Sequence, residues 1–212
     1  MTRDPRTRSR AHVTGRRATP GGRGVFRRHA ALLGMMGSGK STLAPLVAAR
    51  LRMGLVDTDS WIEARAGRSV ARIFARDGEP AFRALELEAL DFLRGRAPAV
   101  IAAGGGLVSV PAAARRLRAL ACCMFLDASP VVLAGRLDAA GHRSRPLLRG
   151  AERDPAAHLS RMLAGRLPAY EAAAHAVLRV DGLSARQAAS LAAWALAALG
   201  SPHRGRAARR RR

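Results

Sequence analysis

The stretch GMMGSGKST (residues 34–42) decides the fold of this chain. It follows the apolar run AALL (30–33), which is typical of a short buried strand, and it opens a segment (40–52) that is predicted to be a helix. A glycine-rich turn between a strand and a helix is the setting of the phosphate-binding loop, with the pattern G-x-x-x-x-G-K-[ST]. The residues that carry this pattern are Gly34, Gly37, Gly39, Lys40 and Ser41.

Each part of this loop has a role in holding a nucleoside triphosphate. Glycines let the backbone wrap around the phosphates, and amide N–H groups at the helix N-terminus point at the anion. Lys40 reaches the β- and γ-phosphates, and the Ser41 hydroxyl can ligate Mg²⁺. Lys40 is the single lysine among 37 basic residues, at a position where a compact ammonium suits the site better than a planar guanidinium. The predicted ATP-binding residues of the loop are Gly37, Ser38, Gly39, Lys40, Ser41 and Thr42.

Outward from the loop, short apolar runs alternate with helical segments. Strands are predicted at 30–33, 54–59 (strand, then turn), 99–103, 122–126 and 176–180. Helices are predicted at 40–52, 60–66, 70–76, 80–94, from Pro111, from Pro130, from Pro155 to about 172, and at 184–199. Start signals are the caps Ser69, Ser129, Asp154 and Ser184, and stop signals include Gly67, Gly78 and Gly95. This alternation predicts an α/β fold with a parallel sheet.

Composition excludes several classes of protein. A chain of 212 residues allows one domain plus tails. The two cysteines, Cys122 and Cys123, are adjacent and lie in a predicted buried strand, which argues against a disulfide scaffold or a metal site. No apolar run reaches the roughly 18 residues that a membrane span needs. With no secretory signal either, these features predict a reducing, cytoplasmic setting.

The formal charge of +22 is concentrated at the two ends of the chain. Residues 1–30 carry a net +8 and residues 201–212 a net +6, without apolar periodicity. We therefore expect a disordered basic extension (1–29), a folded domain (30–200) and a disordered basic tail (201–212). The tails are interpreted as solvated segments, with a transit peptide, a later start at Val25 and nucleic-acid-binding arms as the alternatives.

Two aspartates follow the second predicted strand. Asp57 and Asp59 are two residues apart, which in a strand places both side chains on one face. One carboxylate can then lie near the metal while the other meets a substrate hydroxyl. The alternative is a pair of turn-forming residues in which Asp59 caps the following helix.

Four further motifs resemble one family of kinases. Behind the phosphate loop, the order DTD (57–59), FRALE (82–86), GGG (104–106) and RPLL (145–148) resembles shikimate kinase, and so does the segment GRSVARIFARDGEPAFR (67–83). The resemblance covers roughly residues 30–181. It implies a P-loop NTPase fold of the nucleoside-monophosphate-kinase-like type, a three-layer sandwich with a five-stranded parallel sheet.

The resemblance also implies roles for individual residues. Asp57 would support Mg²⁺ through water, and Asp59 would hold the substrate hydroxyls and orient or deprotonate the attacking one. Arg83 would clamp the substrate carboxylate, with Glu86 holding that arginine. The amides of Gly104, Gly105 and Gly106 would bind the ring substituents, within a substrate-binding segment of about 57–94.

Three more arginines complete the implied site. Arg145 would lie on a lid (about 139–153) that closes over ATP and touches the phosphates. Arg166, in GRLPAY (165–170), would give the second carboxylate contact, and Arg136 would border the adenine. Without the resemblance, Arg83 and Arg166 read as surface arginines on amphipathic helices. Two departures from the family pattern are Ala103 before GGG and Leu55 before DTD.

The activity implied is phosphorylation of the 3-hydroxyl of shikimate by ATP with Mg²⁺, in a monomer that needs neither membrane nor nucleic acid. Shikimate is a small polyol carboxylate, which suits bidentate arginine recognition. The first alternative is another small-molecule kinase of the same fold, acting on gluconate or a nucleotide. The second is a nucleic-acid-binding P-loop protein that uses its basic arms, in which case removal of those arms abolishes function.

Overall fold

The computed structural model describes residues 26–137 and 154–200 of the chain. Within them, five strands form one sheet in the order β2-β3-β1-β4-β5, and every neighbouring pair is parallel. The strands are β1 (His29–Leu33), β2 (Gly54–Asp57), β3 (Ala99–Ala102), β4 (Ala121–Asp127) and β5 (Ala176–Arg179). The predicted α/β class with a five-stranded parallel sheet is confirmed.

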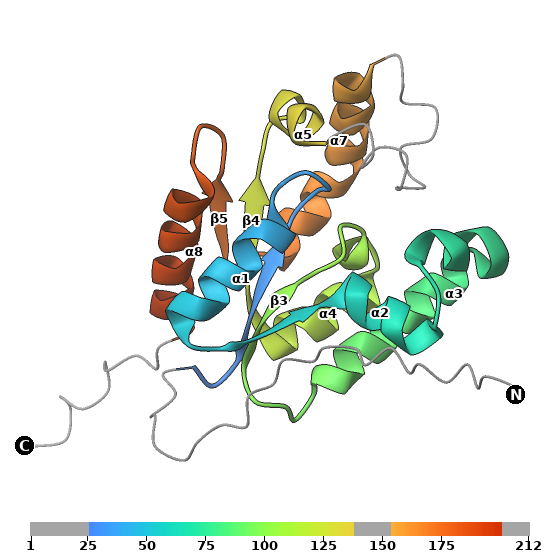
Figure 1. Cartoon of the computed structure of the whole chain (residues 1–212), viewed down its shortest axis with the longest axis horizontal. Coiled ribbons are helices and arrows are strands. Elements are labelled where there is room, and N and C mark those ends of the chain that lie inside the picture. Colours follow the sequence, from blue (N-terminus) through green and yellow to red (C-terminus); the bar gives the residue numbers. More distant parts are fainter. Residues whose placement is uncertain (1–25, 138–153, 201–212) are drawn as a thin grey trace, which may run out of the picture.

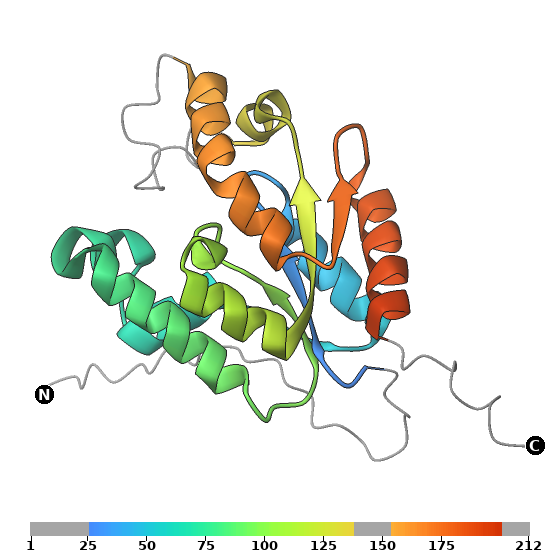
Figure 2. The same cartoon turned by 180° about the vertical axis from the view of Figure 1, so that it is seen from behind.

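Helices cover both faces of the sheet. They are α1 (Lys40–Leu51), α2 (Thr58–Ala66), α3 (Val70–Leu93), α4 (Pro111–Leu120), α5 (Pro130–Arg136), α7 (Pro155–Ala173) and α8 (Ala185–Gly200), with a short 3₁₀ helix η1 (Leu107–Ser109). Helices α1 and α8 pack together on one face, seen in front in Figure 1. Helices α3, α4 and α7 lie on the other face, which points toward the viewer in Figure 2. The fold is therefore a three-layer sandwich.

The predicted helix starts are confirmed by side-chain caps. Each of four predicted cap residues accepts a hydrogen bond from a backbone N–H three residues ahead, one of the donors that a helix leaves unsatisfied at its start. The pairs are Ser69 with Arg72, Ser129 with Val132, Asp154 with Ala157, and Ser184 with Gln187.

The main core lies around the three central strands. Strands β1 and β3 are buried along their whole length, and so are the first six residues of β4. Both cysteines lie in β4, and burial raises the pKa of the Cys123 thiol to about 12. The predicted place of both cysteines in a buried strand is confirmed.

The segment after β2 carries a second, smaller hydrophobic cluster. Ile62 of α2 packs with Ile73, Phe82 and Ala89 of α3, apart from the main core. Helix α3 is interrupted at Gly78, whose φ of 78° and ψ of 176° are not helical. The predicted end of a helix at Gly78 and restart at Pro80 is thus correct. In Figure 1 this segment projects beyond the β2 edge of the sheet, where it forms one wall of the site described below.

Two predictions about boundaries are corrected. Phe26 was placed in the disordered extension, but its ring is buried in the core, and a Cβ at Gly200 would meet it at 2.5 Å. The folded part therefore includes Phe26, and β1 begins at His29. Asp59 lies in the first turn of α2, so the argument that a strand aligns it with Asp57 is wrong. No helix among residues 26–137 and 154–200 is long and apolar enough to cross a membrane.

Candidate active site

The phosphate loop joins β1 to α1 and forms the floor of a cavity of about 560 Å³. A Cβ at Gly34, whose φ is 146°, would lie 2.7 Å from the Ser38 hydroxyl oxygen and 2.8 Å from the Leu126 carbonyl oxygen. Only glycine fits at this turn. The loop residues that line the cavity are Met36, Gly37, Ser38, Gly39, Lys40, Ser41, Thr42 and Leu43. All six predicted ATP-binding loop residues therefore surround the same space.

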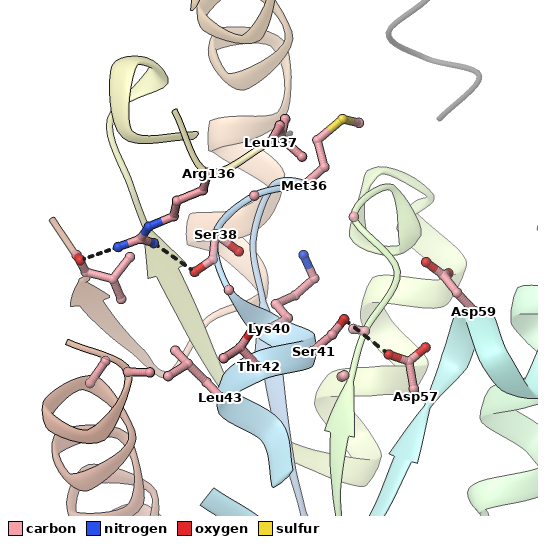
Figure 3. A pocket seen from close by; sticks show the side chains of 18 of the residues that line it. Met36, Ser38, Lys40, Ser41, Thr42, Leu43, Asp57, Asp59, Arg136 and Leu137 are labelled. Atoms are coloured by element: carbon pink, nitrogen blue, oxygen red, sulfur yellow. Dashed lines mark hydrogen bonds between the residues drawn. The ribbon is translucent and has the colours of Figure 1, made fainter. Parts of the chain in front are cut away.

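The ammonium of Lys40 is held over the loop. Its Nζ donates hydrogen bonds to the carbonyl oxygens of Gly34 at 2.7 Å and Met35 at 2.9 Å, and it faces the cavity in Figure 3. Gly39 caps α1 without a side chain, so no capping side chain covers the first amides of the helix. This arrangement is ready for an anion, because the helix N-terminus carries a partial positive charge.

Asp57, the last residue of β2, lies beside the phosphate loop. One of its carboxylate oxygens lies 3.5 Å from the Ser41 hydroxyl, and the other accepts the Ser60 N–H at 3.1 Å (Figure 3). Asp57, rather than Asp59, therefore caps α2, which corrects the alternative interpretation of the pair. The α2 turn also brings Asp59 to the cavity wall, although the reason given from the sequence was wrong.

The three glycines after β3 pack directly against the acidic and basic side chains of the site. A Cβ at Gly104 would lie 2.7 Å from a carboxylate oxygen of Asp59. A Cβ at Gly106 would lie 2.9 Å from both terminal nitrogens of Arg83. Because these glycines have no side chains, Asp59, the predicted hydroxyl contact, and Arg83, the predicted carboxylate clamp, can both approach the same backbone turn.

Arg83 and Glu86 form a short ion pair at this turn, with 2.6 Å between Arg83 Nη1 and Glu86 Oε2. Glu86 is 1% exposed, and burial raises the pKa of its carboxyl against the opposing pull of Arg83. Burial alone would lower the pKa of Arg83, but its hydrogen bonds and charge interactions with Glu86 and Glu79 outweigh burial and raise it. The guanidinium therefore stays charged at any physiological pH.

A second arginine reaches the glycine turn from α7. Arg166 Nη1 lies 3.4 Å from the Gly105 carbonyl oxygen, which also accepts a hydrogen bond from the Tyr170 hydroxyl. Tyr170 is buried and stacks on Phe125, and burial raises the pKa of its phenol to about 12. The structure thus brings Arg166 to the turn that Arg83 also contacts.

Arg136 ends α5 and spans the far end of the cavity. Its guanidinium donates to the Val180 carbonyl oxygen at 3.0 Å and the Ser38 carbonyl oxygen at 3.5 Å (Figure 3). An apolar wall continues from there through Val180, Leu183, Ala185 and Ala188. Arg136 therefore lies between the phosphate loop and this apolar wall. Arg145 and the whole predicted lid (about 139–153) lie outside the described residues.

Sequence reasoning missed several residues of this site. Thr58 is fully buried, and its hydroxyl accepts the Gly104 N–H at 2.8 Å and donates to the Ala102 carbonyl oxygen at 3.4 Å. These hydrogen bonds link the aspartate turn to the glycine turn. The Gly104 amide is therefore already engaged within the protein. The position of Thr58 between Asp57 and Asp59 is the sequence feature that could have identified it. The apolar wall on α8 carries no motif that could have marked it.

This site can transfer a phosphoryl group between two bound molecules. A phosphate cradle with one ammonium lies beside two carboxylates, and two arginines stand at the next turn, which suits a small anionic acceptor. Within the described part of the chain, no group of three or more His, Cys, Asp or Glu side chains is placed to hold a metal ion.

Comparisons with known proteins agree with this geometry. A family model described as shikimate kinase matches residues 36–195. The chain is 42% identical over 150 residues to a shikimate kinase of Symbiobacterium thermophilum, covering 71% of this chain and 85% of that protein. A solved shikimate kinase from Acinetobacter baumannii in complex with shikimate has a TM-score of 0.73 at 28% identity, over 81% of this chain and 92% of that one. A gluconokinase from Sinorhizobium meliloti, with a TM-score of 0.52 and 19% identity over 82% of this chain and 94% of its own, shares the fold alone.

Proposed function

This chain belongs to the shikimate kinase family, and from that premise we propose that it transfers the γ-phosphoryl group of ATP to the 3-hydroxyl of shikimate. The products are ADP and shikimate 3-phosphate, in the biosynthesis of aromatic amino acids. The observation that carries the proposal is the meeting of three elements at one cavity edge: the phosphate loop, the aspartate turn and the glycine turn beside Arg83. A protein that only bound a nucleotide or a nucleic acid would need neither the aspartate turn nor the glycine turn beside Arg83.

One carboxylate and two cationic side chains carry out the transfer. Asp59 orients the attacking hydroxyl and accepts its proton, because its carboxylate lies against the glycine turn where the acceptor would lie. Lys40 offsets the charge on the transferring group from the loop side. We assign Arg145 the same task from the lid, where late closure would also exclude water as a competing nucleophile. Arg136 and the apolar wall hold the adenine.

Arg83 and Arg166 hold the substrate carboxylate. Both reach the glycine turn, Arg83 from α3 and Arg166 from α7, so an acid bound there is held from two helices. Two guanidinium groups fix the plane of a carboxylate as well as its charge. The amides of Gly105 and Gly106 complete the acceptor site.

The donor set beside the loop suits Mg²⁺. The Ser41 hydroxyl and the Asp57 carboxylate face each other at 3.5 Å, and Mg²⁺ prefers such oxygen ligands together with water and substrate phosphate. Ser41 would hold the ion directly and Asp57 through water. When bound, Mg²⁺ neutralises charge on the β- and γ-phosphates. Ala103 lines the cavity beside these residues, and its methyl group adds no further ligand.

The rest of the proposal concerns organisation. We assign one kinase domain, residues 26–200, with a substrate-binding segment at 57–94 and a lid at about 139–153, flanked by two basic segments. We place the protein in the cytoplasm as a monomer. The two buried, adjacent cysteines of β4 support a reducing setting.

The test is ADP release by the full chain with ATP, Mg²⁺ and either shikimate, quinate, gluconate or no acceptor. We expect turnover with shikimate only, and none with the Lys40→Ala variant. Turnover with gluconate would favour the fold-level relative over the family assignment. Folded protein that binds ATP but phosphorylates none of the acceptors would overturn the proposal.

A further inference from the structure

The guanidinium of Arg83 is held from two sides by two glutamates of its own helix. Glu79, four residues before it, accepts hydrogen bonds from Nε at 3.1 Å and from Nη2 at 2.7 Å. Glu86, three residues after it, accepts one from Nη1 at 2.6 Å. Residues at these spacings lie on one face of a helix, so both carboxylates reach the same arginine.

The edge of the guanidinium between Nη1 and Nη2 lies against the glycine turn. A guanidinium is planar and has five N–H donors on three nitrogens. Glu79 accepts from Nε and Nη2, and Glu86 accepts from Nη1. An ideal Cβ at Gly106 would lie 2.9 Å from both Nη1 and Nη2, so the Gly106 backbone covers that edge. The two glutamates and this backbone contact together fix the plane of the guanidinium at the glycine turn.

We propose that Glu79 is a positioning residue of the kinase, one that holds the guanidinium of Arg83 in place for the substrate carboxylate. This inference rests on the proposed function, because it takes Arg83 as the carboxylate clamp. Glu86 alone fixes one nitrogen and leaves the guanidinium free to turn about that bond. Glu79 supplies the second point of attachment, which fixes the plane. An arginine held in advance loses less conformational entropy when the substrate binds.

The exposure of Glu79 supports a role in binding rather than in stability. Its side chain is 60% exposed, whereas Arg83 is 17% exposed and Glu86 is 1% exposed. Exposed ion pairs contribute little to the free energy of folding. Glu79 also directly follows the break at Gly78, so its placement depends on that kink.

A competing interpretation is that Glu79 is a surrogate for the substrate carboxylate and must be displaced. Glu79 bonds two nitrogens of Arg83 at once and so fixes the plane of the guanidinium, which favours positioning. The two interpretations predict opposite effects of removing Glu79. Loss of a positioning contact weakens substrate binding, whereas loss of a competitor strengthens it.

The experiment measures kcat and the KM values for shikimate and ATP in Glu79→Ala and Glu79→Gln. The alanine variant should raise the shikimate KM about fivefold, from one side chain that must now be ordered on binding, with kcat and the ATP KM within about twofold. The glutamine carbonyl can accept the same two hydrogen bonds, so Glu79→Gln should restore a KM at or below that of the wild type. Glu88→Ala is the matched control, because Glu88 is an exposed glutamate of the same helix that pairs with Arg65 instead.

The carboxylate itself provides a second readout. The methyl ester of shikimate lacks the negative charge that Arg83 binds. Glu79→Ala should therefore raise the KM for shikimate more than the KM for the ester, which lowers the ratio of the ester KM to the shikimate KM. A general distortion of the site would raise both values and leave the ratio unchanged. The inference is overturned by an unchanged or lower shikimate KM in Glu79→Ala, by an equal rise in Glu79→Gln, or by an unchanged ratio.

Failure of the inference is separable from failure of the proposed function. Arg83→Ala should raise the shikimate KM well beyond the effect of Glu79→Ala. If Arg83→Ala raises the shikimate KM and Glu79→Ala does not, Arg83 still binds the substrate carboxylate and only the proposed role of Glu79 is wrong. If Arg83→Ala leaves the shikimate KM unchanged, the clamp itself is wrong, and a wild-type chain without shikimate turnover removes the function.

Discussion

Position 106 has no room for a methyl group, although its backbone could accept one. The φ of Gly106 is −105°, which any residue adopts, so a Gly106→Ala variant should fold. Its Cβ would push against both terminal nitrogens of Arg83, which two glutamates hold in place. We expect the shikimate KM to rise at least about tenfold, because a displacement of about 1 Å in a positioned group costs that much or more. Steady-state kinetics check this, and an unchanged KM with an unchanged melting temperature would contradict it.

His29 makes the stability of the fold depend on pH. Its Nδ1 accepts the Ala99 N–H at 3.1 Å, which leaves its Nε2 as the donor to the Leu93 carbonyl oxygen at 3.1 Å. Burial lowers the pKa of this ring, so the unfolded chain binds a proton more readily than the folded one. The stabilisation is complete above the unfolded pKa of about 6.5 and is lost as the pH falls below it.

Urea unfolding at pH values between 7.5 and 5.5 measures this effect. His29→Gln keeps a donor and an acceptor but does not titrate, so its free energy of unfolding should fall less steeply with acidification. Some slope should remain, because burial also lowers the pKa of His175, whose ring accepts the Cys123 N–H. Identical slopes in the two proteins would exclude His29 as the cause.

Single residues were predictable where a motif gave them a fixed neighbour. Lys40 was found from the strand–turn–helix pattern of the phosphate loop, and Arg83 and the glycines at 104–106 from the resemblance to shikimate kinase. Thr58 was missed because its partner, the Gly104 amide, comes from another turn of the chain, and Glu79 because the predicted helix began at Pro80. Asp57 and Asp59 were both correctly placed at the cavity, but their strand geometry was wrong because the helix begins at Thr58.

Among the elements, the broken helix α3 bears most directly on substrate binding. Gly78 has φ 78° and ψ 176°, a region that only glycine occupies without strain. Gly78→Ala should cost about 1–3 kcal/mol of folding free energy and raise the shikimate KM, since Glu79 and Arg83 follow the break. Gly165→Ala is the control for stability, because Gly165 lies within α7 with open space around it and should gain up to about 1 kcal/mol. Urea unfolding of both variants gives the comparison, and a Gly78→Ala protein as stable as wild type would contradict it.

The elements themselves were the most predictable level of the structure. Every strand and cap came from local signals: short apolar runs, and Ser or Asp before Pro or an apolar helix. Two features could not be predicted from local sequence signals. The burial of Phe26 depends on its packing against the end of α8, and the separate cluster around Ile62 depends on how α2 folds back on α3.

The whole molecule carries far more charge at its ends than its site requires. Residues 1–25 and 201–212 together hold +12 of the +22 formal charges. A protein of residues 26–200 should keep kcat and both KM values within about twofold at roughly 0.15 M ionic strength, where charges beyond about 8 Å are screened. Kinetics of the two proteins side by side check this. Loss of turnover in the shorter protein would favour the alternative in which the basic arms carry the function.

The hydrogen bonds of Lys40 have a spectroscopic consequence. Because Lys40 is the only lysine in the chain, growth on isotope-labelled lysine yields a protein with a single labelled side chain, at the phosphate loop. In the structure its ammonium bonds to the carbonyls of Gly34 and Met35, and a bound triphosphate would draw it from those carbonyls to oxyanions. One NMR resonance, needing no assignment, would then follow nucleotide arrival and departure through each turnover.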